Sequence, residues 1–242
     1  MLGMFLVREL SFNMIVKVSV LLLIISSFAG LILTVPKQVK ISGNPHNKKT
    51  IHHFIETKAV PISMIGVLLG IDYSSIVSFL TSYTTQLNLV EAGSFFFMVY
   101  SMAILISRPV SGRLLDTKGA NFIMHPTFVS FAIGLFLLGM TNNGWMLLLA
   151  PAFVGVGFGN FISSGQTIAI KVVPENRIGL ATSTFLAVVD AGVGIGPSIL
   201  GIFVPMIGCN GVYIAMAGVG IIAGICYRVF NKQILNKNRE KH

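Results

Sequence analysis

Two aspartates, Asp72 and Asp190, each lie near the middle of a long apolar run. An ionised carboxylate at the centre of a membrane-spanning helix costs on the order of 2.5 to 3.5 kcal/mol, so such residues face a cavity or a neighbouring helix and not lipid. Burial penalises the charged form of a carboxyl group, which lets it take up and release a proton near neutral pH. We therefore interpret both acids as candidates for proton or cation coupling. The alternative for each is a hydrogen bond to a neighbouring helix that serves assembly alone.

Polar side chains at helical spacing accompany these acids. Ser75, Ser82 and Gln86 follow Asp72 on the same helical face, while Asp190 shares its face with small residues. A later apolar run carries a second polar stripe. From the two stripes we expect a substrate cavity lined by Ser75, Asn160, Ser163, Gln166 and Thr167.

The sequence contains no pattern of a catalytic, cofactor or metal site. Its two cysteines, Cys209 and Cys226, lie at opposite ends of one apolar run and lack disulfide or metal-ligand spacing. The glycine-rich segments at 155–159 and 192–201 lie inside apolar runs with no preceding strand, so neither fits a dinucleotide loop. An intramembrane enzyme is disfavoured, because His125 alone does not supply a nucleophile with its base. We expect no enzyme activity, no cofactor and no metal.

Seven apolar runs hold these residues, and most reach the roughly 20 residues that a helix needs to cross about 30 Å of hydrocarbon. With 54% hydrophobic and 10% charged residues among 242, the chain has too little polar surface for a soluble particle. We predict an all-α, multi-pass membrane protein that contacts the lipid bilayer. The predicted spans are residues 14–35, 59–82, 93–108, 121–140, 145–169, 178–206 and 212–229.

The positive charges alternate between connections. Of the 17 Lys and Arg residues, all but Arg8 and Lys17 lie in or beside the connections that follow the first, third and fifth spans, or near the C-terminus. Because cationic loops are retained in the cytoplasm, we predict a cell-membrane protein with its N-terminus outside and its C-terminus in the cytoplasm. This pattern also accounts for the net charge of +9, so nucleic acid is not an expected partner.

The connection between the third and fourth spans, residues 107–121, carries a charged motif. It resembles the cytoplasmic signature of the major facilitator superfamily: Gly, three residues, Asp, a basic residue, any residue, Gly, then basic residues. Gly112, Asp116 and Gly119 match, whereas Thr117 replaces the first basic residue and Lys118 comes one residue late. The resemblance implies a cytoplasmic gate, in which Asp116 forms a charge-assisted latch beside a helix N-terminus. The gate motif comprises Arg108, Gly112, Arg113, Asp116, Lys118 and Gly119.

The sixth span resembles a second signature of that superfamily, the antiporter motif Gly, three residues, Gly-Pro, two residues, Gly-Gly. Gly192, Gly196, Pro197 and Gly201 match, and Leu200 replaces one glycine. Small residues let helices approach closely, and a proline removes one backbone hydrogen bond and bends the helix. The resemblance implies a hinge or seal at this place in a rocking transporter.

Together the two motifs imply the C-terminal part of a twelve-helix transporter. Residues 1–35 are then the end of helix five and helix six, residues 36–58 a basic cytoplasmic linker, residues 59–230 a six-helix bundle and residues 231–242 a basic cytoplasmic tail. Such transporters bind substrate between two six-helix halves and rock to alternate access. We expect a truncated secondary active transporter that, when complete, exports drug-like small molecules by proton-coupled antiport, with a separate N-terminal half as a partner.

Two alternatives stay open at this point. A nonfunctional remnant of a disrupted gene is compatible with the same resemblance. A seven-helix receptor would also have its N-terminus outside, but no Asp-Arg-Tyr triplet follows the third span and no Asn-Pro signature occurs in the seventh.

Overall fold

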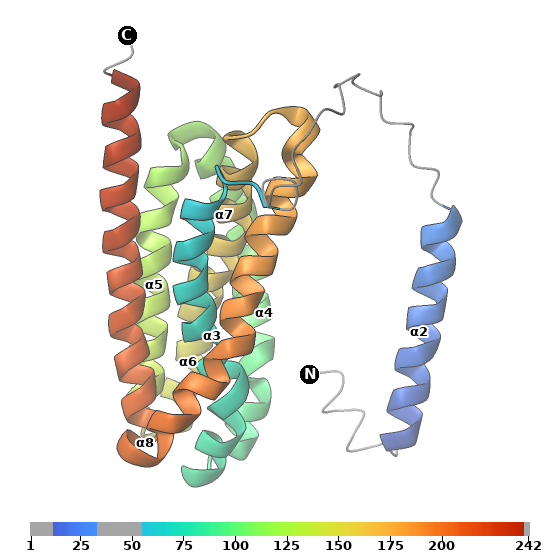
Figure 1. Cartoon of the computed structure of the whole chain (residues 1–242). Helices are drawn as coiled ribbons and strands as arrows, with labels where there is room; N and C mark the ends of the chain where they lie inside the picture. Colours follow the sequence, from blue (N-terminus) through green and yellow to red (C-terminus); the bar gives the residue numbers. More distant parts are fainter. Residues whose placement is uncertain (1–11, 33–54, 240–242) are drawn as a thin grey trace. The chain divides into compact units, whose positions relative to one another are not determined.

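The computed structural model of the protein describes residues 12–32 and 55–239, and every regular element in these ranges is a helix (Figure 1). The chain divides into two compact units, Met1–Thr50 and Ile51–His242. In the first unit the described element is α2 (Phe12–Ile32), which is apolar over most of its length. The predicted linker at 36–58 lies mostly outside the described residues, and so do the chain ends at 1–11 and 240–242.

The second unit begins with three helices joined by short connections. These are α3 (Val60–Gln86), α4 (Val90–Lys118) and α5 (Ala120–Gly139). The next membrane-length segment is composite: α6 (Gly144–Val154) and α7 (Asn160–Lys171) flank one turn of π-helix, η2 (Gly155–Gly159).

The last helix contains a sharp turn. A short 3₁₀ segment, η3 (Glu175–Arg177), leads into α8 (Ile178–Arg239). At Gly208, φ of 69° and ψ of 170° interrupt the helical geometry, a conformation that glycine adopts without a Cβ clash. α8 therefore consists of a first limb, residues 178–207, and a second limb, residues 209–239, which run in opposite directions in Figure 1.

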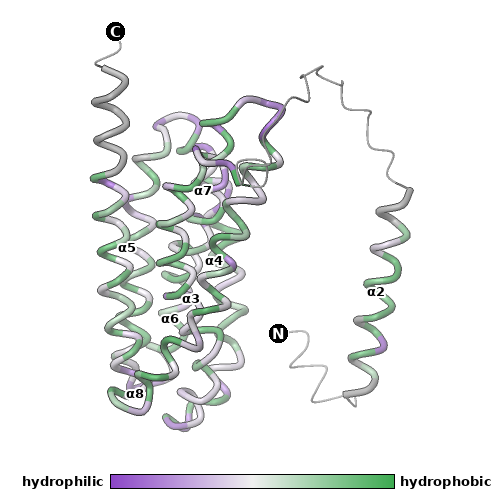
Figure 2. The backbone as a smooth tube through the Cα atoms, in the orientation of Figure 1, coloured by the Kyte–Doolittle hydropathy of each residue, from purple (hydrophilic) through white to green (hydrophobic). Residues whose placement is uncertain are grey.

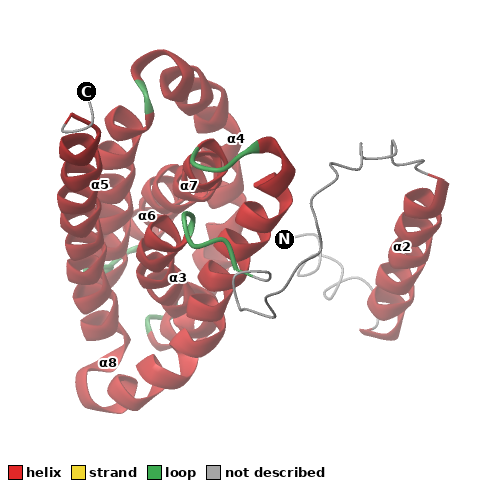
Figure 3. Ribbon diagram, turned by 45° about the horizontal axis from the view of Figure 1, so that its top comes forward, coloured by secondary structure: helices red, strands yellow, loops and turns green. Residues whose placement is uncertain are grey.

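The all-helical membrane fold predicted from the sequence is confirmed. Five helical segments in the described ranges are long and apolar enough to cross a membrane, and α8 carries two of the predicted spans. Figure 2 shows apolar residues along the helices and hydrophilic residues gathered at their ends. Figure 3 shows how little of the described chain lies outside helices, so the unit is held together by helix packing.

α4 differs from its predicted extent. The third span was expected to end at Arg108, but α4 continues through Pro109 to Lys118, and Gly119 alone joins it to α5. An apolar run ends where a helix leaves hydrocarbon, whereas its backbone hydrogen bonds continue into the polar layer. Gly119 reverses the chain with φ of 82°, which favours glycine. The gate motif is thus the last part of a helix and not a loop.

α3 and the first limb of α8 pack backbone to backbone through glycines. A Cβ on Gly70 would lie 2.6 Å from the carbonyl oxygen of Val189, and a Cβ on Gly192 would lie 2.6 Å from that of Val67. A Cβ on Gly196 would collide with Ser74. Close helix approach at small residues is a principal source of packing energy inside membranes. The two helices are therefore in direct backbone contact along this seam.

Within the second unit, α4 is the least covered of the membrane-length helices. Only 6% of its apolar stretch is buried inside the structure, compared with 56% for α3 and 61% for α5. Its exposed side chains include Met102, Leu105 and Ile106. This face needs lipid or another polypeptide to cover it.

Candidate transport site and motif regions

Asp72 on α3 is completely buried. Within the described part of the chain, neither of its carboxylate oxygens has a hydrogen-bond partner. Oδ2 lies 3.5 Å from the place that a Cβ on Gly220 would occupy, so the carboxyl group points towards the second limb of α8. It is therefore enclosed inside the unit. A buried acid without a partner in a membrane helix is a functional candidate, as the sequence indicated.

The polar groups next to Asp72 are satisfied locally and do not reach its carboxylate. The hydroxyl of Ser75 donates to the main-chain oxygen of Asp72 at 2.6 Å. The Tyr213 hydroxyl donates to the main-chain oxygen of Ser75 at 3.4 Å. Ser75 is itself fully buried, so in this arrangement it lies in the helix contact between α3 and α8.

Asp190 has different surroundings. It lies on the first limb of α8 and is exposed on the surface of the unit, as are its neighbours Ala191 and Gly194. The sequence pattern treated the two acids alike, but the fold encloses Asp72 and leaves Asp190 on the outside of the unit. Their assignment to coupling stays a prediction.

The polar residues of α7 also differ in how deeply they are buried. Asn160 is buried, and its amide joins α7 to α4: Nδ2 donates to the hydroxyl of Ser107 at 3.1 Å, and Oδ1 accepts from the hydroxyl of Ser111 at 2.8 Å. Ser163, Gln166 and Thr167 are half-buried. The hydroxyl of Thr167 donates to the main-chain oxygen of Ser163 at 2.9 Å. Asn160 thus ties α7 to α4, the helix that carries the gate motif.

A turn of π-helix precedes Asn160, and such turns are frequent at functional sites. Its glycines allow close contact with two helices. A Cβ on Gly155 would lie 2.6 Å from the main-chain oxygen of Tyr100, and a Cβ on Gly157 would lie 2.6 Å from Cα of Phe131.

An aromatic stack that the sequence did not indicate lies beside this turn. The ring of Tyr73 lies parallel to that of Phe158, with centroids 4.1 Å apart, and Tyr100 stacks on Tyr73 at 5.9 Å. The three rings come from α3, η2 and α4. No spacing along the chain could have revealed the cluster, because only the packing of three helices brings the rings together.

The gate motif lies on the exposed end of α4. Arg108, Arg113, Asp116 and Lys118 are exposed, and a Cβ on Gly112 would have no neighbour within 4 Å. The Lys118 ammonium lies 4.5 Å from the centre of the Phe122 ring, a cation–π contact. Among the described residues Asp116 forms no ion pair, so the charged latch stays a prediction.

An ion pair that the sequence did not suggest closes the same end of the unit. Glu56, just before α3, is 2% exposed, and its backbone N–H donates to the hydroxyl of Thr184 on α8 at 3.0 Å. Its Oε2 lies 3.1 Å from Nη1 of Arg177, an ion pair whose angles are not those of a hydrogen bond. The contact fastens the chain that enters α3 to the start of α8. We refer to Glu56, Arg177 and Thr184 as the entry clamp.

The sequence of the chain matches a known protein family. The model of the Major Facilitator Superfamily matches residues 62–241, which includes both motif regions and Asp72 and Asp190. The chain belongs to the Major Facilitator Superfamily. The resemblance inferred from the motifs is confirmed. Superfamily members are transporters, so this is a transporter-family protein and not an enzyme.

Superfamily relatives include drug-resistance proteins. The chain is 30% identical over 181 residues to the multidrug resistance protein MdtG of Dickeya zeae, which covers 71% of this chain and 43% of that protein. It is 30% identical over 164 residues to MdtG of Proteus mirabilis, covering 65% of this chain and 40% of that protein. The chain spans about two fifths of the length of the curated relatives that it matches.

Proposed function

We propose that residues 59–230 are the C-terminal six-helix half of a Major Facilitator Superfamily transporter, and that α2 is the last helix of the preceding half. α3, α4, α5, the α6–α7 segment and the two limbs of α8 are then helices seven to twelve. With an N-terminal half opposite, the assembly exports drug-like small molecules in exchange for protons by alternating access. The drug-like substrate class is inferred from the relatives, which are multidrug resistance proteins.

The exposure of Asp190 is the observation that carries this proposal. Asp190 lies 12 residues into the first limb of α8, roughly 18 Å from its start, and so within the hydrocarbon layer. A carboxyl group at that depth faces a bundle interior or a water-filled cavity and not lipid. Since Asp190 is on the surface of its own unit, another polypeptide must enclose the space in front of it. A second six-helix half does so.

The uncovered face of α4 supports the same arrangement. The apolar stretch of α4 is nearly unburied, and motif residue Gly112 has open space around it. No residue of its own unit lies against Gly112. A glycine at this position would let a helix of the opposite half approach closely.

The candidate residues then take separate roles. Asp72 and Asp190 carry protons, and Ser163, Gln166 and Thr167 line the substrate cavity, with Asn160 fixing α7 against α4. Asp116, with Arg113 and Lys118, forms a charged latch to the other half. Gly192, Gly196, Pro197 and Gly201 form the hinge: Gly192 and Gly196 let α8 approach α3 closely, and Pro197 removes one backbone hydrogen bond and bends the helix.

Transport measurements on reassembled halves test the proposal. The full chain is reconstituted in vesicles alone and together with the N-terminal half of an MdtG relative. Under an imposed pH gradient, a fluorescent drug-like probe should move only when both halves are present. Asp116→Asn should then lower the flux far more than the amount of protein in the membrane, whereas Thr117→Ala should change neither.

Two other results of this experiment would count against the proposal. Gradient-driven flux by the chain alone would contradict the need for a second half. No flux in either arrangement, with both halves inserted and associated, would favour the nonfunctional alternative.

A further inference from the structure

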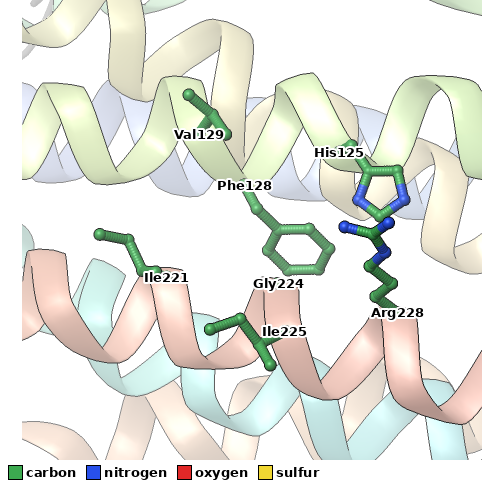
Figure 4. A pocket seen from close by; sticks show the side chains of 7 residues that line it. All are labelled: His125, Phe128, Val129, Ile221, Gly224, Ile225 and Arg228. Atoms are coloured by element: carbon green, nitrogen blue, oxygen red, sulfur yellow. The ribbon is translucent and has the colours of Figure 1, made fainter.

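A surface pocket lies between α5 and the second limb of α8, and Figure 4 shows its lining. The cavity has a volume of about 180 Å³. Its walls are mostly apolar: Phe128 and Val129 come from α5, and Ile221, Gly224 and Ile225 come from α8. Val129, Ile221 and Ile225 are more than half exposed, so the pocket opens onto the apolar surface that a membrane covers.

One end of the pocket is basic. The guanidinium of Arg228 and the imidazole of His125 lie at this end, close to the ring of Phe128 (Figure 4). In the described ranges, the ion pair found is the one in the entry clamp, and Arg228 has no acidic partner. A guanidinium is the side chain best suited to bind a phosphate, with parallel N–H donors. The charge of this end is complementary to an anion.

Helix geometry places the basic end at the membrane surface. Arg228 lies about 20 residues beyond the turn at Gly208, which is about 30 Å along the limb and equals the thickness of the hydrocarbon layer. His125 lies in the second turn of α5, at the same end of the unit as Lys118. The basic end is therefore at headgroup depth, and the apolar part of the pocket is at acyl-chain depth.

We propose that this pocket binds an anionic phospholipid, with its phosphate between Arg228 and His125 and the upper part of one acyl chain against Phe128 and Val129. The cavity is too small for a whole lipid, so the rest of the chain lies along the exposed apolar surface below it. A zwitterionic headgroup brings a cation close to Arg228, which disfavours it relative to an anionic one. The site lies on a lipid-facing surface and does not depend on the transport function proposed above.

Native mass spectrometry of the full chain in detergent tests this site. The probes are phosphatidylglycerol and phosphatidylcholine with identical acyl chains. Phosphatidylglycerol should bind about ten-fold more tightly, and Arg228→Gln should remove about that factor. His125→Gln should have a smaller effect, and Val129→Trp should weaken both lipids because it fills the exposed apolar part. Lys171→Gln, which removes an exposed charge at the same end of the unit, is the matched control and should change nothing.

The proposal fails if the two lipids bind equally, or if Arg228→Gln and Lys171→Gln have the same effect. Glycerol 1-phosphate separates a lipid site from a simple phosphate site: if it displaces the lipid as readily as a short-chain phosphatidylglycerol does, the pocket recognises phosphate alone. Arg228→Lys keeps the charge and should keep most of the preference for phosphatidylglycerol. Circular dichroism of each variant identifies any loss that comes from misfolding.

Discussion

At the scale of single residues, Asp72 and Asp190 differ in burial. Both are acids in the middle of apolar helices, but Asp72 is enclosed with no hydrogen-bond partner in the described structure, whereas Asp190 is exposed on its unit. A polar group buried without a partner costs free energy of folding. At Asp72, stability therefore opposes the proton-carrying role proposed above.

We expect Asp72→Leu to raise the melting temperature of the purified chain in detergent. It removes a buried carboxyl group that has no partner, which should stabilise the fold by about 1–3 kcal/mol. Asp116→Leu is the control, and it should change the stability by less than about 0.5 kcal/mol because Asp116 is exposed at the polar end of α4, outside the apolar stretch. Scanning fluorimetry measures both. A lower melting temperature for Asp72→Leu would mean that the carboxyl group has a stabilising partner after all.

The same two residues predict the proton dependence of transport. In the reassembled transporter, Asp72→Asn and Asp190→Asn should abolish accumulation driven by a pH gradient, because an amide cannot take up and release a proton. Facilitated exchange of substrate without a gradient should persist. Flux measured with and without the gradient distinguishes the two effects. Full coupling in both variants would remove these acids from the mechanism.

At the scale of helices, α3 and the first limb of α8 meet in a seam of close glycine contacts. Gly192 is in backbone contact with α3, while Gly194, two residues further on, has no neighbour within 4 Å of a Cβ. The helix propensity of both glycines is equally poor. The two positions differ only in whether α3 lies against them.

Gly192→Ala and Gly194→Ala should therefore change stability in opposite directions. The first forces a methyl group to within 2.6 Å of a main-chain oxygen and should cost about 1–3 kcal/mol. The second meets nothing and should gain up to about 1 kcal/mol from the better helix propensity of alanine. Thermal unfolding of the two variants in detergent measures this. Equal changes would show that the seam does not exist in the membrane protein.

The entry clamp is the second feature of this scale. Arg177→Gln should destabilise the unit more than Glu56→Gln does. The first variant leaves a buried carboxylate without its countercharge, which costs about 1–3 kcal/mol, whereas the second leaves a partly exposed guanidinium that water can solvate. Limited proteolysis near residue 56 and melting temperatures measure the effect. Equally small losses in both variants would mean that the backbone contact to Thr184, which both variants keep, and not the charge, holds the clamp.

At the scale of the whole molecule, the described unit has surfaces that its own residues do not cover. The apolar stretch of α4 is almost entirely exposed, and the first limb of α8 exposes Asp190. Lipid can cover the first surface but not the second. Such uncovered surfaces are expected if the unit pairs with a second six-helix half, as proposed above. The orientation of the unit in the membrane can be tested separately.

Single cysteines test the orientation. In a background with Cys209→Ala and Cys226→Ala, cysteines introduced at Ser42 and Asn236 should be labelled by an impermeant thiol reagent only after the cells are opened. A cysteine at the exposed Asn142, in the connection between α5 and α6, should be labelled from outside and serves as the control. Labelling of Ser42→Cys and Asn236→Cys in intact cells would reverse the topology.

The sequence by itself determined the all-helical membrane fold, the approximate ranges of the long apolar helices and the family, because the length of apolar runs is set by bilayer thickness and the motifs are local in the chain. Only the tertiary structure separated a buried Asp72 from an exposed Asp190, joined Asn160 to Ser107 and Ser111, and brought Glu56 to Arg177 across more than a hundred residues. It also showed that α4 continues through Pro109, since hydrogen bonding and not hydropathy decides where a helix ends. Membrane helices are apolar on nearly all sides, so periodicity does not show which side faces a neighbour, and contacts between distant helices depend on packing that no local pattern encodes.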